Sequence, residues 1–481
     1  MTTEYETHDH DVLIIGAGGA GLRAALGALA QGAKVGVVCK SLLGKAHTVM
    51  AEGGIAAAMA NVDSADDWRT HFRDTMRGGK LLNNWRMAQL HAQEAPERVR
   101  ELEQWGALFD RTQDGQILQR AFGGHTFRRL CHVGDRTGLE MIRTLQDRGV
   151  QLGIDVYMEC TITRLLKDGD RVAGAFGYWR EQGRFVVFRA RSIVLATGGI
   201  GKAWKITSNS WEYTGDGMAL AYDAGAELMD MEFVQFHPTG MVWPPGVQGI
   251  LVTEAVRGEG GVLRNKLGNR FMEQYDPKKM ELSTRDVVAR AIYTEVREGR
   301  GTEHGGAYLD ISQKPADYVK KKLPSMYHQF KELADVDITK GPMEVGPTCH
   351  YMMGGFASMR KPRNRPCLDS LPRGRQPPDS TAQTGWAGTL FLTCWSSAIA
   401  QAWRPPNMRR QFRLRPLIPG RSKRPDARLW LPSNAKTERA LIRFIVTCRK
   451  PCRIWLASFV TRKISLVHWK NWRNSRSALN V

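Results

Sequence analysis

The chain has 481 residues, with 69 Lys and Arg against 48 Asp and Glu, and its formal net charge of +21 is concentrated at one end. Residues 1–355 hold 43 basic and 44 acidic residues, whereas residues 356–481 hold 26 basic and 4 acidic ones. The near-neutral first part argues against a polyanionic partner, and cysteines without a CxxC pair argue against an iron–sulfur cluster or a zinc site. An acidic N-terminus and the lack of a run of about 18 uncharged apolar residues argue against a signal peptide or a membrane span.

The N-terminal segment predicts a dinucleotide-binding βαβ unit. The apolar run 11–15 is typical of a buried parallel strand, and an Ala-rich helical stretch extends to Gln31, with Gly32 at the C-cap. Between them stands the turn Gly16-Ala17-Gly18-Gly19-Ala20-Gly21. In this strand–turn–helix context, glycines let a pyrophosphate approach the backbone at the helix N-terminus. We therefore expect these six residues to bind a dinucleotide.

A second strand, 34–39, lacks the carboxylate expected at its end for a ribose hydroxyl and is followed by Lys40 and Ser41. A hydroxyl, an amine or backbone must then replace the acid. The later strand 191–195 enters another Gly turn, Ala196-Thr197-Gly198, and two such turns fit FAD better than NAD. Alternating runs and turns over 156–189 predict an antiparallel meander. The expected fold class is α/β, a doubly wound (Rossmann-like) FAD-binding domain over 1–240 with this meander inserted.

The segment 45–55, which contains His47-Thr48 and Gly53-Gly54, resembles the flavoprotein subunits of succinate dehydrogenase and fumarate reductase, in the FAD-dependent oxidoreductase 2 family. The resemblance implies that His47 carries FAD covalently on its 8α carbon, with Thr48, Gly53 and Gly54 beside it. A covalently substituted flavin is a better electron acceptor, and for a two-electron couple about 30 mV corresponds to about 1.4 kcal/mol. Taken alone, His47 would be an ordinary loop imidazole.

The resemblance continues through the segments 122–125, 135–138 and 214–217. In the last of these, Asp216 matches a family aspartate that approaches the flavin side of the pocket, so it is a cofactor candidate. An Asx turn or a helix N-cap is the alternative interpretation of Asp216.

Four further segments, 232–240, 253–261, 283–290 and 347–351, resemble the substrate and proton-transfer segments of the family. They imply an α+β capping domain over 241–353, and they imply that His237, Thr253 and His350 hold the substrate carboxylates. Arg285 would be the proton donor or acceptor, and Glu254 and Arg257 would relay protons to solvent. The alternatives are structural histidines and a surface ion pair between Glu254 and Arg257, which are spaced i, i+3.

Succinate oxidation needs the flavin on one face of the substrate, to take a hydride, and a base on the other, to take a proton. The resemblance implies an iron–sulfur subunit that accepts the electrons, membrane anchor subunits with quinone beyond it, and a cytoplasmic location, peripheral on the inner face of the cytoplasmic membrane. No metal site and no nucleic-acid partner are expected. L-aspartate oxidase shares several motifs but binds FAD without a covalent His, so His47 argues against it.

The composition changes after Gly355. Residues 356–481 hold 7 of the 14 Trp and 12 of the 21 Pro, but only 4 of the 49 Gly. An out-of-frame translation that replaces the rest of the FAD domain and a C-terminal helical domain explains this best; an independent domain and a segment that binds nucleic acid or anionic lipid are the alternatives. The family's Gly-Glu and Asn-Arg-Leu-Gly-Gly motifs are missing there. We therefore expect weak or no activity, and a truncated non-catalytic flavin-binding product is the remaining alternative.

Overall fold

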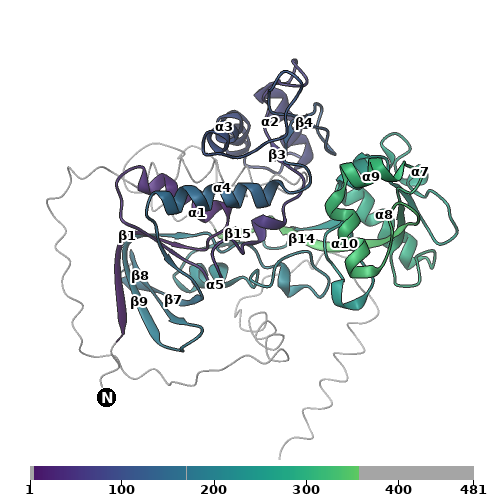
Figure 1. The fold of residues 1–481 in the computed structure, drawn as a ribbon. Helices are drawn as coiled ribbons and strands as arrows, with labels where there is room; N and C mark the ends of the chain where they lie inside the picture. Colours follow the sequence, from purple (N-terminus) through teal and green to yellow (C-terminus); the bar gives the residue numbers. More distant parts are fainter. Residues whose placement is uncertain (1–4, 170, 357–481) are drawn as a thin grey trace, which may run out of the picture. The chain divides into compact units, whose positions relative to one another are not determined.

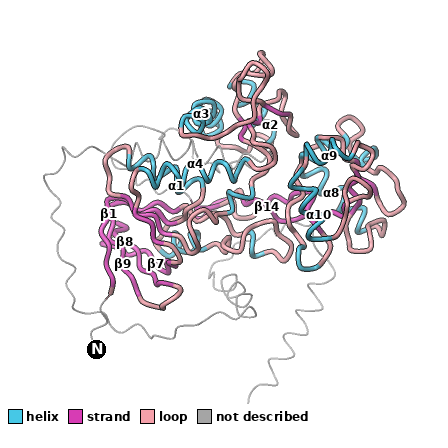
Figure 2. The backbone as a smooth tube through the Cα atoms, in the orientation of Figure 1, coloured by secondary structure: helices cyan, strands magenta, loops and turns pink. Residues whose placement is uncertain are grey.

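The computed structural model describes residues 5–169 and 171–356. The predictions made for the basic tail fall on residues 357–481 and lie outside the described residues. Figure 1 shows the helices and strands in chain order, and Figure 2 shows the loops that join them.

The largest sheet has six strands in the order β6-β2-β1-β9-β8-β7. These strands are β6 (Asp155–Tyr157), β2 (Val35–Val38), β1 (Glu6–Ile15), β9 (Phe185–Leu195), β8 (Arg171–Trp179) and β7 (Cys160–Asp168). β1 runs parallel to β2 and β9, whereas β7, β8 and β9 are antiparallel neighbours. This topology confirms the doubly wound sheet with its antiparallel meander. β9 belongs to both parts, because it ends the meander and pairs with β1.

Helices cover both faces of this sheet, with α1 (Gly19–Leu29) and α4 (Thr137–Gln151) on one face and α5 (Asp216–Asp223) on the other (Figure 1). Successive side chains of β1 point to opposite faces of the sheet, so both faces are apolar and each is covered by helices. Val12 and Ile14 pack in the cluster that includes residues of α1, whereas Leu13 and Ile15 pack with Leu220 of α5. A strand that is buried on both faces has a continuous run of apolar residues in its sequence.

Residues between β2 and α4 form a smaller, mostly helical part. It contains the short helix η1 (His47–Met50), the helices α2 (Trp68–Gly78) and α3 (Trp85–Gln104), and the sheet of β3 (Ile55–Ala56), β5 (Leu130–Cys131) and β4 (Gln119–Arg120). Arg129 is fully buried beneath α2, where it donates to Asp66 at 3.1 and 2.7 Å and to Asp74 at 2.8 Å. The guanidinium thereby hydrogen-bonds two carboxylates that are themselves buried and is their common cation.

The residues from β11 to β14 form a second part, which has its own hydrophobic core. Its antiparallel sheet runs in the order β11 (Val234–Met241), β14 (Met343–Met352), β13 (Ala307–Asp310) and β12 (Val262–Arg264). The helices are α6 (Ala255–Gly258), α7 (Met272–Tyr275), α8 (Arg285–Arg297), α9 (Ala316–Lys322) and α10 (Pro324–Ala334), with the short helices η3 (Pro245–Val247) and η4 (Met280–Leu282). Val252, Phe271, Ile292 and Leu309 are buried in one apolar cluster there.

The chain leaves the first part and returns to it through neighbouring strands. β11 crosses residue 240, the predicted domain limit, and β14 lies antiparallel to it. β15 (Gly355–Phe356) then pairs with β10 (Leu228–Met229). The short helix η2 (Gly201–Ala203) precedes this crossing. The limits of the two predicted domains stay predictions.

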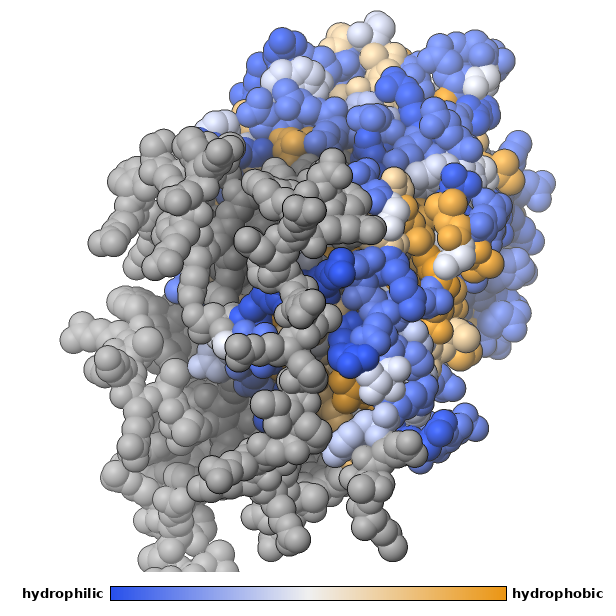
Figure 3. Space-filling model, turned by 90° about the vertical axis from the view of Figure 1, so that its left-hand side faces the viewer, coloured by the Kyte–Doolittle hydropathy of each residue, from blue (hydrophilic) through white to orange (hydrophobic). Residues whose placement is uncertain are grey.

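Across the described residues, no helix combines the length and apolar character that a membrane span requires. In the space-filling view, hydrophobic residues gather in a patch that borders hydrophilic residues of the described part (Figure 3). Contiguous apolar surface of this kind is typical of contact sites between proteins.

Candidate active site

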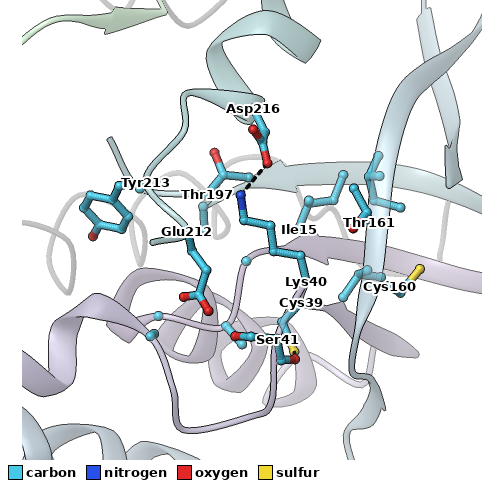
Figure 4. A pocket seen from close by; sticks show the side chains of 18 of the residues that line it. Ile15, Cys39, Lys40, Ser41, Cys160, Thr161, Thr197, Glu212, Tyr213 and Asp216 are labelled. Atoms are coloured by element: carbon cyan, nitrogen blue, oxygen red, sulfur yellow. Dashed lines mark hydrogen bonds and ion pairs between the residues drawn. The ribbon is translucent and has the colours of Figure 1, made fainter. Parts of the chain in front are cut away.

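A pocket lies where β1, β2 and β9 end, at the carboxyl edge of the parallel strands (Figure 4). This edge is where open α/β sheets bind their ligands. The predicted cofactor residues that line the pocket are Gly16, Ala17, Gly18, Lys40, Ser41, His47, Ala196, Thr197, Gly198 and Asp216. The structure thus brings together side chains and turns from four distant segments of the chain.

The other predicted cofactor residues, Gly19, Ala20, Gly21, Thr48, Gly53 and Gly54, lie outside the lining of the pocket. The first three form the first turn of α1. Thr48 Oγ1 accepts a hydrogen bond from the Gly19 amide at 3.2 Å, which ties the His47 segment to the N-terminus of α1.

Two glycines are sterically required in the first turn. Gly16 has a φ of +113°, and a Cβ there would lie 2.3 Å from the carbonyl oxygen of Ala196. A Cβ on Gly21 would lie 1.8 Å from the carbonyl oxygen of Gly16. The turn after β1 is therefore packed against the turn after β9 with no room for a side chain at either position.

At the end of β2, Lys40 lies where a dinucleotide fold usually has its acid. Lys40 Nζ donates to Asp216 at 2.7 Å and to Thr214 at 2.8 Å, and Glu212 also lines this pocket (Figure 4). Asp216 comes 176 residues after Lys40. Two carboxylates, those of Asp216 and Glu212, thus reach this pocket from another segment, and the expectation that a hydroxyl, an amine or backbone replaces the acid stays a prediction.

Asp216 begins α5, and the N-cap of that helix is Gly215, whose φ is +83°. The alternative interpretation of Asp216 as a helix N-cap is therefore wrong. Its carboxylate is turned to Lys40, at the end of β2, rather than to the helix N-terminus.

His47 is the first residue of η1 and lines the same pocket. The Ser210 amide donates to its Nδ1 at 3.3 Å, Asn209 Nδ2 lies 3.4 Å from its Nε2, and the Tyr213 ring centroid is 4.6 Å away. Removal from water lowers the pKa of His47 to about 4. The imidazole is therefore neutral near pH 7 and keeps a lone pair.

A buried cluster of charges lies beside the pocket, between α6 and α8. Arg285 Nε donates to Glu254 at 3.1 Å, and Arg257 Nη2 lies 3.6 Å from the same carboxylate. Glu254 also accepts from the Gly123 amide at 3.1 Å, and Arg285 donates to Gln235 at 3.3 Å. Because the side chains of Glu254 and Arg257 are 5% and 0% exposed, the interpretation as a surface ion pair is wrong.

The electrostatics of this cluster keep Glu254 ionised. Burial alone would raise the pKa of Glu254, but the charges of Arg257 and Arg285 outweigh it, so that its pKa lies below the usual value. Burial also lowers the pKa of Arg257. Its Nη1 donates to the Glu281 carbonyl at 2.7 Å, while Nε and Nη2 make no hydrogen bond to any described residue. A guanidinium with free donors and a reduced preference for its proton suits proton transfer.

Two of the predicted carboxylate-binding residues, His237 and His350, lie on neighbouring strands, and the third, Thr253, lies in the loop before α6. The rings of His237 in β11 and His350 in β14 are 5.2 Å apart, and Ser208 Oγ lies 2.7 Å from His350 Nδ1. Burial lowers the pKa of both histidines well below its usual value, and the nearby Arg285 lowers it further. Thr253 is buried, and burial raises the pKa of the Glu52 carboxyl to about 8.

Asn209 joins the pocket to this cluster. Its amide donates to the His350 carbonyl at 2.6 Å and approaches His47 at 3.4 Å. Sequence reasoning missed Asn209, together with Glu52, Ser208, Glu212 and Gln235. For Ser208 and Asn209 the only local signal is the run of polar residues 207–210, whereas Glu52 and Gln235 lie inside segments that carry the family resemblance.

The part of the chain that the structure describes contains no group of His, Cys, Asp and Glu side chains arranged for a metal ion. Cys39, Cys131, Cys160 and Cys349 are free and buried.

A doubly wound sheet with a glycine-lined pocket at its carboxyl edge defines a dinucleotide-binding protein. Comparison with known families narrows the class, because the family model described as "FAD binding domain" matches residues 11–358. The chain belongs to this family.

Relatives agree with this assignment. The chain is 52% identical over 353 residues to a fumarate reductase (CoM/CoB) subunit of Methanothermobacter marburgensis, covering 73% of this chain and 64% of the relative. It is 41% identical over 368 residues to "Succinate dehydrogenase flavoprotein subunit" of Rickettsia bellii, covering 74% and 61%. The solved structure "Mycobacterium smegmatis Sdh1 in complex with UQ1" superposes with a TM-score of 0.67 at 55% identity, covering 83% of this chain and 70% of that one.

These comparisons confirm the resemblance that the motifs indicated for residues 8 to about 355. The chain spans somewhat less than two thirds of the curated relatives that it matches.

Proposed function

We propose that this chain is the flavoprotein subunit of a succinate dehydrogenase or fumarate reductase, which interconverts succinate and fumarate. The observation that carries the proposal is the buried Arg285–Glu254–Arg257 cluster, which Asn209 joins through His350 to the pocket that contains His47. This arrangement combines a cofactor pocket with a chain of proton-transfer groups.

The pocket suits FAD. Gly16, Ala17 and Gly18 leave backbone exposed at the N-terminus of α1, where a pyrophosphate would be stabilised. Lys40 with Asp216 would hold the adenosine ribose at the end of β2, and His47 would carry the isoalloxazine covalently through Nε2, since Ser210 occupies Nδ1. When bound, the flavin would accept a hydride from succinate or return one to fumarate.

Replacing Gly21 with Ala should reduce the fraction of purified chain that carries flavin by about ten- to hundredfold, because overpacking by one methyl typically costs about 1–3 kcal/mol. The added methyl would collide with the Gly16 carbonyl and distort the turn. The ratio of flavin to protein absorbance measures the effect. Gly246→Ala is the matched control, since a Cβ there meets nothing within 4 Å. Equal flavin content in both variants would contradict the assignment of this turn.

The chain's own residues would handle the substrate and the proton. His237, Thr253 and His350 would bind the carboxylates and fix the substrate between the pocket and Arg285. Arg285 would exchange a proton with the substrate carbon, because Glu254 beside it can accept the proton in turn. Arg257, with two unused donors, would pass the proton on towards solvent.

For partners, we propose an iron–sulfur subunit that takes the electrons, with membrane anchor subunits and quinone beyond it. Two of the relatives are called subunits, which supports a multisubunit assembly. The location would be cytoplasmic, peripheral on the inner face of the cytoplasmic membrane. The hydrophobic patch of Figure 3 offers a surface for such contacts.

We expect steady turnover by the isolated chain to be weak or absent, since no family Asn-Arg-Leu-Gly-Gly motif follows residue 355, but a single reaction between its reduced flavin and fumarate should still occur. A sensitive test is single turnover: the purified chain's flavin is photoreduced, and its reoxidation at 450 nm is followed after fumarate is added without oxygen. Reoxidation by fumarate, lost in Arg285→Gln, supports the proposed function. Reduction of the flavin by L-aspartate but not by succinate would reassign the chain to the L-aspartate oxidase class.

A further inference from the structure

We propose that Asp74, in α2, is a positioning residue for the proton-transfer pair Arg285 and Glu254, which it orients through the turn of residues 122–126. The inference rests on the function proposed above. Asp74 is remote from that pair in sequence and does not touch it, so it would act only through the turn.

One end of this turn lies directly on the proton-transfer pair. The Gly123 amide donates to Glu254 Oε1 at 3.1 Å, and the guanidinium carbon of Arg285 lies 5.2 Å from the Phe122 ring centroid. A Cβ on Gly123 would lie 2.7 Å from Glu254 Oε1, so the backbone approaches the carboxylate as closely as a glycine allows. A small displacement of the turn would therefore lengthen the hydrogen bond to Glu254 and move the ring away from Arg285.

The other end of the turn is held by Asp74. The Thr126 amide donates to one carboxylate oxygen at 2.9 Å, and Thr126 Oγ1 donates to the other at 2.7 Å. Asp74 is only 5% exposed and is held in turn by the buried Arg129 at 2.8 Å. Hydrogen bonds to a charged group are stronger than those between neutral groups. The Asp74 carboxylate, fixed by Arg129, therefore holds Thr126 firmly.

Asp74 is not one of the charged groups that face Glu254 and Arg285 directly. The charged groups that face Glu254 are Arg257 from α6 and Arg285 from α8, while His237 and His350 face Arg285 from β11 and β14. The Gly123 hydrogen bond is one of the causes that hold the pKa of Glu254 below its usual value. If the turn moved, Glu254 would therefore bind a proton at higher pH.

The test uses Thr126→Val, which removes the hydroxyl and keeps the backbone amide, and Thr126→Ser, which restores the hydroxyl. Thr339→Val is the matched control, because Thr339 also donates to an aspartate, Asp337, through its amide and its hydroxyl. Hydrogen exchange, resolved at the Gly123 amide by mass spectrometry, should become about tenfold faster in Thr126→Val, return to the original rate in Thr126→Ser and stay unchanged in Thr339→Val.

A second readout separates positioning from general loosening. The acid limb of the pH profile for flavin reoxidation by fumarate should move up by about half to one pH unit in Thr126→Val alone, since Glu254 loses a hydrogen bond that favours its charged form. Unchanged exchange at Gly123, or an exchange effect that Thr126→Ser does not reverse, overturns the inference. An unmodified chain that never reacts with fumarate refutes the proposed function instead, and the exchange result still decides the role of Asp74.

Discussion

A chain in which His47 is replaced by Ser should carry no covalent flavin, whereas the unmodified chain should retain FAD after denaturation. Burial lowers the pKa of His47 to about 4, so its imidazole is neutral, and because Nδ1 accepts from the Ser210 amide, the bond to carbon would form at Nε2 with loss of the Nε2 proton. A serine hydroxyl at this position is shorter and far less nucleophilic. Flavin fluorescence of the protein band in a denaturing gel soaked in acid measures the outcome.

His328→Ser is the control for this experiment, since His328 is an exposed histidine on α10. It should keep its fluorescent band at full intensity. A band that persists in His47→Ser would show that another residue carries the flavin, and its absence from the unmodified chain would favour non-covalent FAD.

The second large effect concerns folding. Replacing Arg129 with Met should lower the free energy of unfolding by about 3–5 kcal/mol, because removing one partner of a buried ion pair leaves uncompensated charge. Here two buried carboxylates, Asp66 and Asp74, would lose their common cation. Urea unfolding followed by far-UV circular dichroism measures the change at pH 7.

The neighbouring Arg128 provides the matched control. It also forms a two-pronged ion pair, with Asp63, but its side chain is 51% exposed. Arg128→Met should therefore cost less than about 1 kcal/mol. The deficit of Arg129→Met should also shrink as the pH falls, since burial already raises the pKa of Asp66 and protonation removes its charge. Equal losses of unfolding free energy in Arg129→Met and Arg128→Met would contradict the argument that burial makes the Arg129 ion pairs important for stability.

Local patterns predicted the first part of the fold because its signals lie within short windows. The apolar run before Gly16 became β1, and the Ala-rich stretch became α1, which ends at Leu29, shortly before Gly32. The paired turns after β1 and β9 were also foreseeable, because each glycine turn directly follows its strand. The strand β1 begins earlier than predicted, at Glu6, since its polar first half pairs along β9.

Only those residues of the candidate site that lie in recognisable family motifs could be predicted from the sequence. Arg285, Glu254 and Arg257 were expected from the resemblance, and the structure brings both arginines within 3.1 to 3.6 Å of the Glu254 carboxylate. Asn209 and Asp74 could not be foreseen, because their roles depend on which loops pack together in three dimensions. Neither residue stands in a periodic pattern or at a spacing that favours one partner over another.

The pairing of β1 with β9 has a consequence for the order in which the chain is made. Val12 pairs with Ser192, so β1 must wait for about 180 more residues to be made before this neighbour exists. Until then the edge of β1 that will face β9 has no partner, and the Gly16 turn lacks the Ala196 backbone against which it closes. Cofactor capture must therefore follow the synthesis of β9, although the residues that begin the pocket are translated long before it.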